Sequence, residues 1–123
     1  MSYKNLDIYK MALDLFLRTH PISFRLPQYE LYELGSQLRR SSDSVITNIV
    51  EGYGRSCYKN DYIRFLVYSH VSNDETINHL DKLIMLYPAI SHEFETLRNE
   101  YNILGSKINV YKKWVKENWN ESK

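Results

Sequence analysis

The feature that most constrains the fold is a run of apolar residues near the end of the chain, spaced by alternating steps of three and four. The run comprises Phe94, Leu97, Tyr101, Leu104, Ile108, Tyr111 and Val115. This spacing places all seven side chains on one face of an α-helix, in the heptad pattern by which helices pack side by side. We therefore expect a long helix that begins near Ser91, a favourable N-cap residue. Gly105 lies inside the run and predicts close backbone packing at this point.

Two earlier segments show the same helical periodicity and are bounded by prolines and glycines. The first extends from about Tyr3 to His20, and we expect Pro21 to end it, because the residue before a proline disfavours the α conformation. The second begins with Pro27 in its first turn, where the missing N–H costs nothing. We expect it to end at Gly52 and Gly54, which adopt the left-handed cap conformation readily.

A third periodic segment follows the polar connection at residues 55–59. Asn60 suits the N-cap of this helix, and Pro88 closes it. Its middle is unusually polar, because His70, Asn73 and Asp74 interrupt the apolar stripe. No segment alternates at period two for long enough to form a convincing strand. Four helices with short connections predict an all-α protein, a single domain over residues 1–123 built as an antiparallel up-and-down four-helix bundle.

The composition agrees with one soluble domain, since the 123 residues are 43% hydrophobic and 25% charged. A formal net charge of +1 excludes a global cationic field, so nucleic-acid binding would require a local patch. The single cysteine, Cys57, excludes an intrachain disulfide and fits a reducing compartment. The chain has no apolar segment of membrane length and no apolar run behind its first lysine, so we expect a cytoplasmic protein with no membrane partner.

The chain lacks the residue patterns of enzymes that use four-helix bundles. Metal-binding bundles carry Glu-x-x-His pairs, and no acidic residue stands three positions before any of the four histidines. Two pairs lie one helical turn apart, Glu75 with His79 and His70 with Asp74, and they favour a structural or solvent-exposed role over a metal site. The lone Cys57 favours an inert loop thiol over a reactive one. We expect no enzyme activity, no metal, no cofactor and no small-molecule substrate.

A polar stripe runs beside the apolar seam of the second helix. Its members are Arg40, Ser44, Thr47 and Glu51, with Asn48 close by. Such a stripe is either a solvated face or a hydrogen-bonded layer between helices. Arg39 and Arg40 point about 100° apart, so at most one of them faces inward. An inward arginine requires an acidic partner, and we predict Glu75 of the third helix for that role.

Residues 37–55 read Gln-Leu-Arg-Arg-Ser-Ser-Asp-Ser-Val-Ile-Thr-Asn-Ile-Val-Glu-Gly-Tyr-Gly-Arg, with Phe65-Leu66 and Ser72-x-x-Glu75 further on. This pattern closely resembles the four-helix-bundle family encoded in intervening sequences of bacterial 23S ribosomal RNA genes. The resemblance implies a bacterial bundle that assembles as a homopentameric ring. It also implies kinship with the accessory protein of diversity-generating retroelements, a pentamer that binds nucleic acid and a reverse transcriptase. The matched residues, for which we expect structural roles, are Gln37, Arg39, Arg40, Ser41, Ser44, Asn48, Glu51, Gly52, Arg55, Ser72 and Glu75.

Two mixed basic and aromatic patches are candidate partner sites. The first, around the connection between the second and third helices, combines Arg55, Lys59 and Arg64 with Tyr53, Tyr58 and Tyr62. It suits stacking on unpaired bases, or its tyrosines cap a bundle end or fill a subunit interface. The second, near the C-terminus, combines Lys107, Lys112, Lys113 and Lys116 with Trp114 and Trp119. It is either a binding surface or a solvated face, since the helix dipole favours lysines there.

Together these features predict a non-enzymatic, self-associating helical scaffold. The resemblance implies that it is a homopentamer and that RNA or a nucleoprotein is its partner. The alternative is a pure protein–protein interaction module that binds no nucleic acid. In either case we expect the basic and aromatic patches or the ring itself to carry the function.

Overall fold

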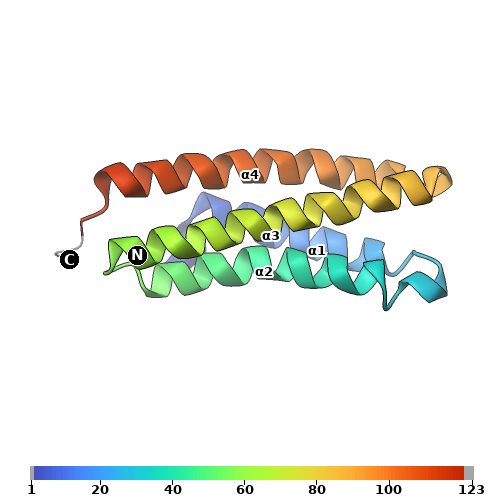
Figure 1. Ribbon diagram of the computed structural model, residues 1–123, viewed down its shortest axis with the longest axis horizontal. Coiled ribbons are helices and arrows are strands. Elements are labelled where there is room, and N and C mark those ends of the chain that lie inside the picture. The colour runs from blue at the N-terminus through green and yellow to red at the C-terminus, as the bar shows by residue number, and fades with distance from the viewer. Residues whose placement is uncertain (1, 121–123) are drawn as a thin grey trace.

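The computed structural model describes residues 2–120, which form four long helices in an antiparallel up-and-down bundle (Figure 1). The helices are α1 (Asp7–Ser23), α2 (Leu34–Gly54), α3 (Lys59–Leu86) and α4 (His92–Asn118). Single 3-10 turns precede three of them: η1 (Tyr3–Asn5), η2 (Gln28–Glu30) and η3 (Pro88–Ile90). No strand occurs among the described residues. The predicted all-α, four-helix architecture is confirmed.

The predicted boundaries of the first two helices are wrong around the prolines. Helix α1 continues past Pro21 to Ser23, because a proline in the last turn removes only one helical hydrogen bond. The Ser23 hydroxyl also donates to the carbonyl of His20 (2.7 Å) and satisfies a terminal acceptor. Pro27 starts the short turn η2 rather than α2, which begins seven residues later. The intervening chain turns inward on two buried residues, Leu26 and Glu30.

The expected caps also differ from those observed. Neither Gly52 nor Gly54 has a positive φ, so the left-handed cap is absent. Gly52 is instead required for close approach of α3, since a Cβ there would lie 2.9 Å from the Cβ of Phe65. Asn60 lies inside α3, whose N-cap position is Tyr58. The boundary predicted at Ser91 is correct, but its hydroxyl donates to the carbonyl of Pro88 instead of capping α4.

The apolar seam predicted for the last helix forms the centre of the core. Six of its seven members are at most 2% exposed, namely Phe94, Leu97, Tyr101, Leu104, Ile108 and Val115. The seventh, Tyr111, is partly buried against them. Helix α3 lies between α2 and α4 and packs closely on both, whereas α1 packs on α2 and, less extensively, on α4. The helices therefore form a closed square in which α1 and α3 occupy opposite corners.

The middle of α3 contributes a buried, hydrogen-bonded layer that includes Asn73, whereas His70 is half-buried and Asp74 is exposed. The bonds of this layer to α2 join the Ser69 hydroxyl to the carbonyl of Val45 (2.8 Å), Ser72 to Ser44 (2.8 Å) and Thr76 to Ser41 (2.9 Å). Asn48 donates to Ser44 and extends the layer along α2. The other members of the polar stripe, Arg40, Thr47 and Glu51, are exposed, as is Gln37. The polar stripe of α2 is therefore partly a solvated face and partly a hydrogen-bonded layer between helices.

Gly105 brings α4 against this polar layer. A Cβ at this position would lie 2.9 Å from Nδ2 of Asn73, which donates to the carbonyl of Tyr101 (2.8 Å). Close packing at this glycine is confirmed, although the neighbour is a side chain rather than backbone.

The predicted pairing of Glu75 with an inward arginine is wrong. Glu75 is exposed and belongs to none of the ion pairs among the described residues. Arg40 is exposed as well. Arg39 is half-buried, but it points toward the connection between α1 and α2, where it donates to the carbonyl of Leu31 (2.6 Å). Its guanidinium carbon also lies 4.3 Å from the ring centroid of Phe24.

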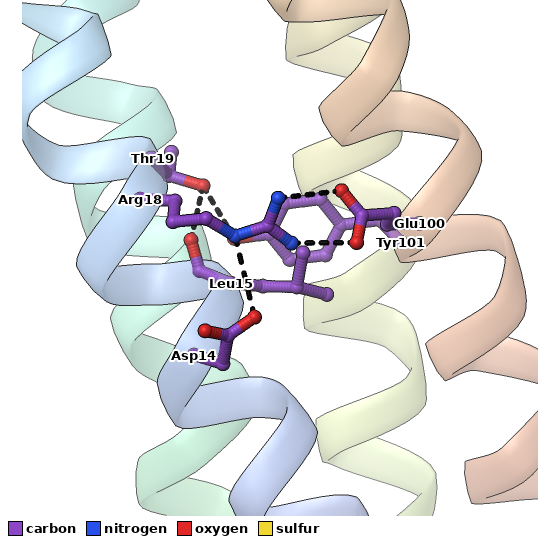
Figure 2. Close-up of polar contacts among 6 residues, drawn as sticks. All are labelled: Asp14, Leu15, Arg18, Thr19, Glu100 and Tyr101. Carbon is purple, nitrogen blue, oxygen red and sulfur yellow. Dashed lines mark hydrogen bonds and ion pairs between the residues drawn. The ribbon is translucent and has the colours of Figure 1, made fainter.

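An ion pair that sequence analysis did not find connects α1 to α4 (Figure 2). Arg18 donates to both carboxylate oxygens of Glu100, at 2.7 and 2.6 Å, and lies 3.2 Å from Asp14. The hydrogen bonds from Arg18 lower the pKa of the Glu100 carboxyl group. Beside this pair, the hydroxyls of Thr19 and Tyr101 are 2.8 Å apart, and burial raises the pKa of Tyr101 to about 12. These contacts hold the second half of α1 on α4.

We predict that Glu100→Gln lowers the free energy of unfolding by about 1 kcal/mol at pH 7, since the bidentate pair is partly exposed and therefore screened. Because folding lowers the pKa of Glu100, its stabilising effect is complete above the unfolded pKa and is lost as the pH falls through the folded value. The difference between wild type and variant in urea denaturation should therefore shrink as the pH falls below the ordinary glutamate pKa of about 4.3, and it should vanish once the carboxyl group is protonated in the folded protein as well. Glu75→Gln is the control and should change little. A difference that is independent of pH would contradict this role for the carboxylate.

We also predict that Gly105→Ala destabilises the bundle by about 1–3 kcal/mol, because the new methyl group displaces Asn73 from its hydrogen bond. Gly54→Ala is the matched control, since nothing lies within 4 Å of a Cβ at that position. The control should be neutral or slightly stabilising, as expected for replacing a helical glycine. Equal stability of the two variants in chemical denaturation would show that the contact at Gly105 is not tight.

Candidate nucleic-acid interface

The two basic and aromatic patches meet at one end of the bundle. The connection from α2 to α3 and the last turns of α4 lie side by side at this end (Figure 1). The indole N–H of Trp119 donates to the carbonyl of Ser56 and joins them directly. The two patches were separate in the sequence, because more than 40 residues lie between Arg64 and Lys107.

The aromatic residues of this end divide into core and surface. Tyr62 is fully buried, and its hydroxyl bonds that of Tyr111 (2.7 Å), so burial raises its pKa. Of the two roles left open for the tyrosines, Tyr62 therefore has the structural one, because it fills the bundle end and its ring is not accessible to bases. Tyr53 is half-buried with its ring edge against Tyr62. Tyr58 is 67% exposed, whereas Trp114 is 47% exposed and its ring stacks on that of Tyr111.

The arginines of the first patch have acidic partners three or four residues before them in the sequence. Arg55 lies 3.6 Å from Glu51, and Arg64 lies 3.0 Å from Asp61. Both guanidinium groups also approach the ring of Phe65, with centroid distances of 4.9 and 5.7 Å. Lys59 begins α3 and is half-buried. The positive charge of this patch is therefore partly neutralised, although both arginines remain exposed.

The lysines of the second patch have no such neutralisation. No acidic side chain of the described residues forms an ion pair with Lys107, Lys112, Lys113 or Lys116. Lys112 is half-buried, and the other three are exposed. The positive charges of these lysines are therefore available to a partner. They attract exposed anions such as phosphates most strongly.

Charge is distributed unevenly along the bundle. We define the basic half as residues 2–12, 46–68 and 106–120, the segments that share the end containing both patches. It contains nine Lys and Arg against four Asp and Glu, whereas residues 13–45 and 69–105 contain six against ten. The net charge of +1 thus conceals an excess of five positive charges at one end and four negative charges at the other.

The residues considered for metal binding or reactivity do not assemble into a site. Nowhere in residues 2–120 do three His, Cys, Asp or Glu side chains gather as metal ligands. His70 and Asp74 lie 3.5 Å apart, while His79 is buried and its pKa is lowered by desolvation. Cys57 is exposed in the connection between α2 and α3. Among the described helices, none is both long and apolar enough to cross a membrane.

Comparison with known proteins identifies the family. A profile described as 23S rRNA-intervening sequence protein matches residues 4–110. The matched segment covers most of the bundle and includes the whole of α2 and α3, but it ends before Lys112, Lys113 and Lys116. A search of curated proteins finds no match. Because the profile spans most of the chain, the protein belongs to the 23S rRNA-intervening sequence protein family.

Proposed function

We propose that this protein is a non-enzymatic, self-associating helical scaffold that binds RNA through the basic half of its bundle. The observation that carries this proposal is the separation of charge, which gives one end nine basic against four acidic side chains. Counterion release from phosphates supplies most of the affinity of proteins that bind nucleic acid without reading bases. A local excess of five positive charges is sufficient for such binding at moderate salt, although the whole chain is nearly neutral.

The surface around the lysines supports an RNA partner in particular. Tyr58 is largely exposed in the connection between α2 and α3, at the same end of the molecule as the lysines of the second patch. Aromatic faces beside basic side chains suit the unstacked bases of loops and bulges, which RNA presents more often than duplex DNA. The positions proposed to contact RNA are Arg55, Lys59, Arg64, Tyr53, Tyr58, Lys112, Lys113 and Lys116.

Self-association strengthens this site without new contacts. The family resemblance implies a homopentamer, and five copies of the basic half in one assembly would contact one RNA together. Linked weak sites gain avidity because each contact after the first is intramolecular. A patch of modest charge therefore suffices in an oligomer.

A pure protein–protein interaction module remains the second candidate, and an apolar groove between α1 and α4 favours it. This groove has a volume of about 650 Å³, is lined largely by apolar side chains and contains few charges. Such a surface suits a protein partner better than a nucleic acid. The two candidates predict opposite results in a binding titration.

The test is a fluorescence-anisotropy titration of labelled 23S rRNA fragments and a control DNA duplex at several salt concentrations. We expect Lys113→Gln/Lys116→Gln to weaken RNA binding about tenfold at low salt and to flatten the salt dependence, since two phosphate contacts are lost. The matched control, Arg40→Gln/Lys82→Gln, removes the same charge from the acidic half and should bind as the wild type does. Equal losses in both variants would contradict the site, and no binding by wild type at low salt would favour the protein-interaction module.

A further inference from the structure

The groove between α1 and α4 opens at the basic end of the bundle. Its floor and walls are formed mainly by Leu6, Ile8, Ile103, Val110, Tyr111 and Trp114. Val110 is 70% exposed and Ile103 is 51% exposed, and because both line this groove their exposed apolar surface is contiguous. Arg18 and Glu100 hold the second half of α1 on α4, and among residues 2–120 no ion pair connects the first half of α1 to α4 beside the groove.

A second apolar surface lies on the outward side of α3. It consists of Val67, Tyr68 and Val71, spaced by three and four residues so that they form one stripe. Val71 is 48% exposed and Tyr68 is 46% exposed. Because α1 and α3 occupy opposite corners of the bundle, the stripe and the groove face different directions.

The groove and the stripe lie at the same level along the bundle. Tyr111 of α4 bonds Tyr62 of α3, and the carbonyl of Tyr101 accepts from Asn73. The α4 segment from 101 to 111 therefore runs beside the α3 segment from 62 to 73. Ile103 and Val110 fall within the first segment, and the whole stripe falls within the second. A neighbouring copy can thus bring its stripe to the groove by rotation, without sliding along the bundle axis.

The charges beside the two surfaces are arranged in complementary order. From the basic end inward, the groove carries Asp7 and then Lys107. In the same direction the stripe is bounded by Arg64 and then Glu75. When two copies point the same way, the acidic end of one surface faces the basic end of the other. An antiparallel arrangement would bring like charges together, which disfavours it.

We infer that the stripe on α3 of one copy docks in the α1–α4 groove of the next, with the bundles side by side and pointing the same way. This inference rests on the proposed self-association and adds its two surfaces and its orientation. A contact between two different surfaces that is repeated by rotation, without a shift along the axis, forms a closed ring when the rotation divides a full turn. All basic halves then lie on one side of the ring, where a single RNA contacts several of them.

The test uses variants that each damage one surface. Val110→Glu places a charge in the groove, and Val71→Glu places one on the stripe. Both positions are exposed, so the fold should persist, as circular dichroism will show. Light scattering after size exclusion should give a multimer for the wild type and a monomer of 14.7 kDa for each variant. Leu17→Glu, at an exposed apolar position outside both surfaces, is the matched control and should remain multimeric.

Mixing the two variants gives the sharpest result. Each retains the surface that the other lacks, so an equimolar mixture should form a heterodimer of twice the monomer mass, whereas neither variant does so alone. Failure of the mixture to dimerise, or variants that remain multimeric, would overturn this pairing while leaving self-association intact. A wild-type protein that is monomeric at all concentrations would instead overturn self-association itself. Ile103→Glu and Val67→Glu form a second pair if either first variant unfolds.

Discussion

The arrangement of this bundle depends on the close approach of α3 to both of its neighbours. Small residues make that approach possible, with Gly52 of α2 against Phe65 and Gly105 of α4 against Asn73. The serines and threonine at the α2–α3 contact are buried, but their hydroxyls bond carbonyls or one another. Since a buried hydroxyl is costly only when it lacks a partner, this layer fixes the register of the helices without a large penalty.

Because of this close packing, the four helices do not contribute equally to the bundle. Helices α2, α3 and α4 form a tightly packed unit, and α1 joins it chiefly through α2. On α4, the second half of α1 is held by Arg18 and by Thr19, whose partners are Glu100 and Tyr101 (Figure 2). Within the part of the chain that the structure describes, the ion pairs include none between the first half of α1 and α4, and the apolar groove lies there.

The sequence was sufficient to predict the fold and most of the core, because the α4 seam has a period that only a helix satisfies. The sequence was insufficient wherever a residue's role depended on which residue of another helix lies beside it in the fold. Periodicity placed Glu75 on a polar stretch of α3, but it did not reveal that this side chain faces outward. Local proline preference was overridden at Pro27, where burial of Leu26 and Glu30 directs the chain.

The candidate site shows the same limitation. Nearness in sequence grouped Tyr62 with the basic patch, although a helix turns it into the core. The lysines were identified, but summing charge over the whole chain concealed the basic half. Assigning each charged residue to one end of an up-and-down bundle would have revealed it, since the helix ends were known approximately from the sequence.

The separation of charge also gives the molecule an electric dipole that owes little to its backbone. In an antiparallel bundle the helix dipoles oppose one another in pairs, so the side chains determine the direction of the moment. In dilute salt, the field of a polyanion should orient the protein so that its basic end approaches first. At physiological ionic strength the Debye length of about 8 Å is shorter than the bundle, so the two ends interact with their surroundings independently. Approach and final binding therefore respond differently to salt.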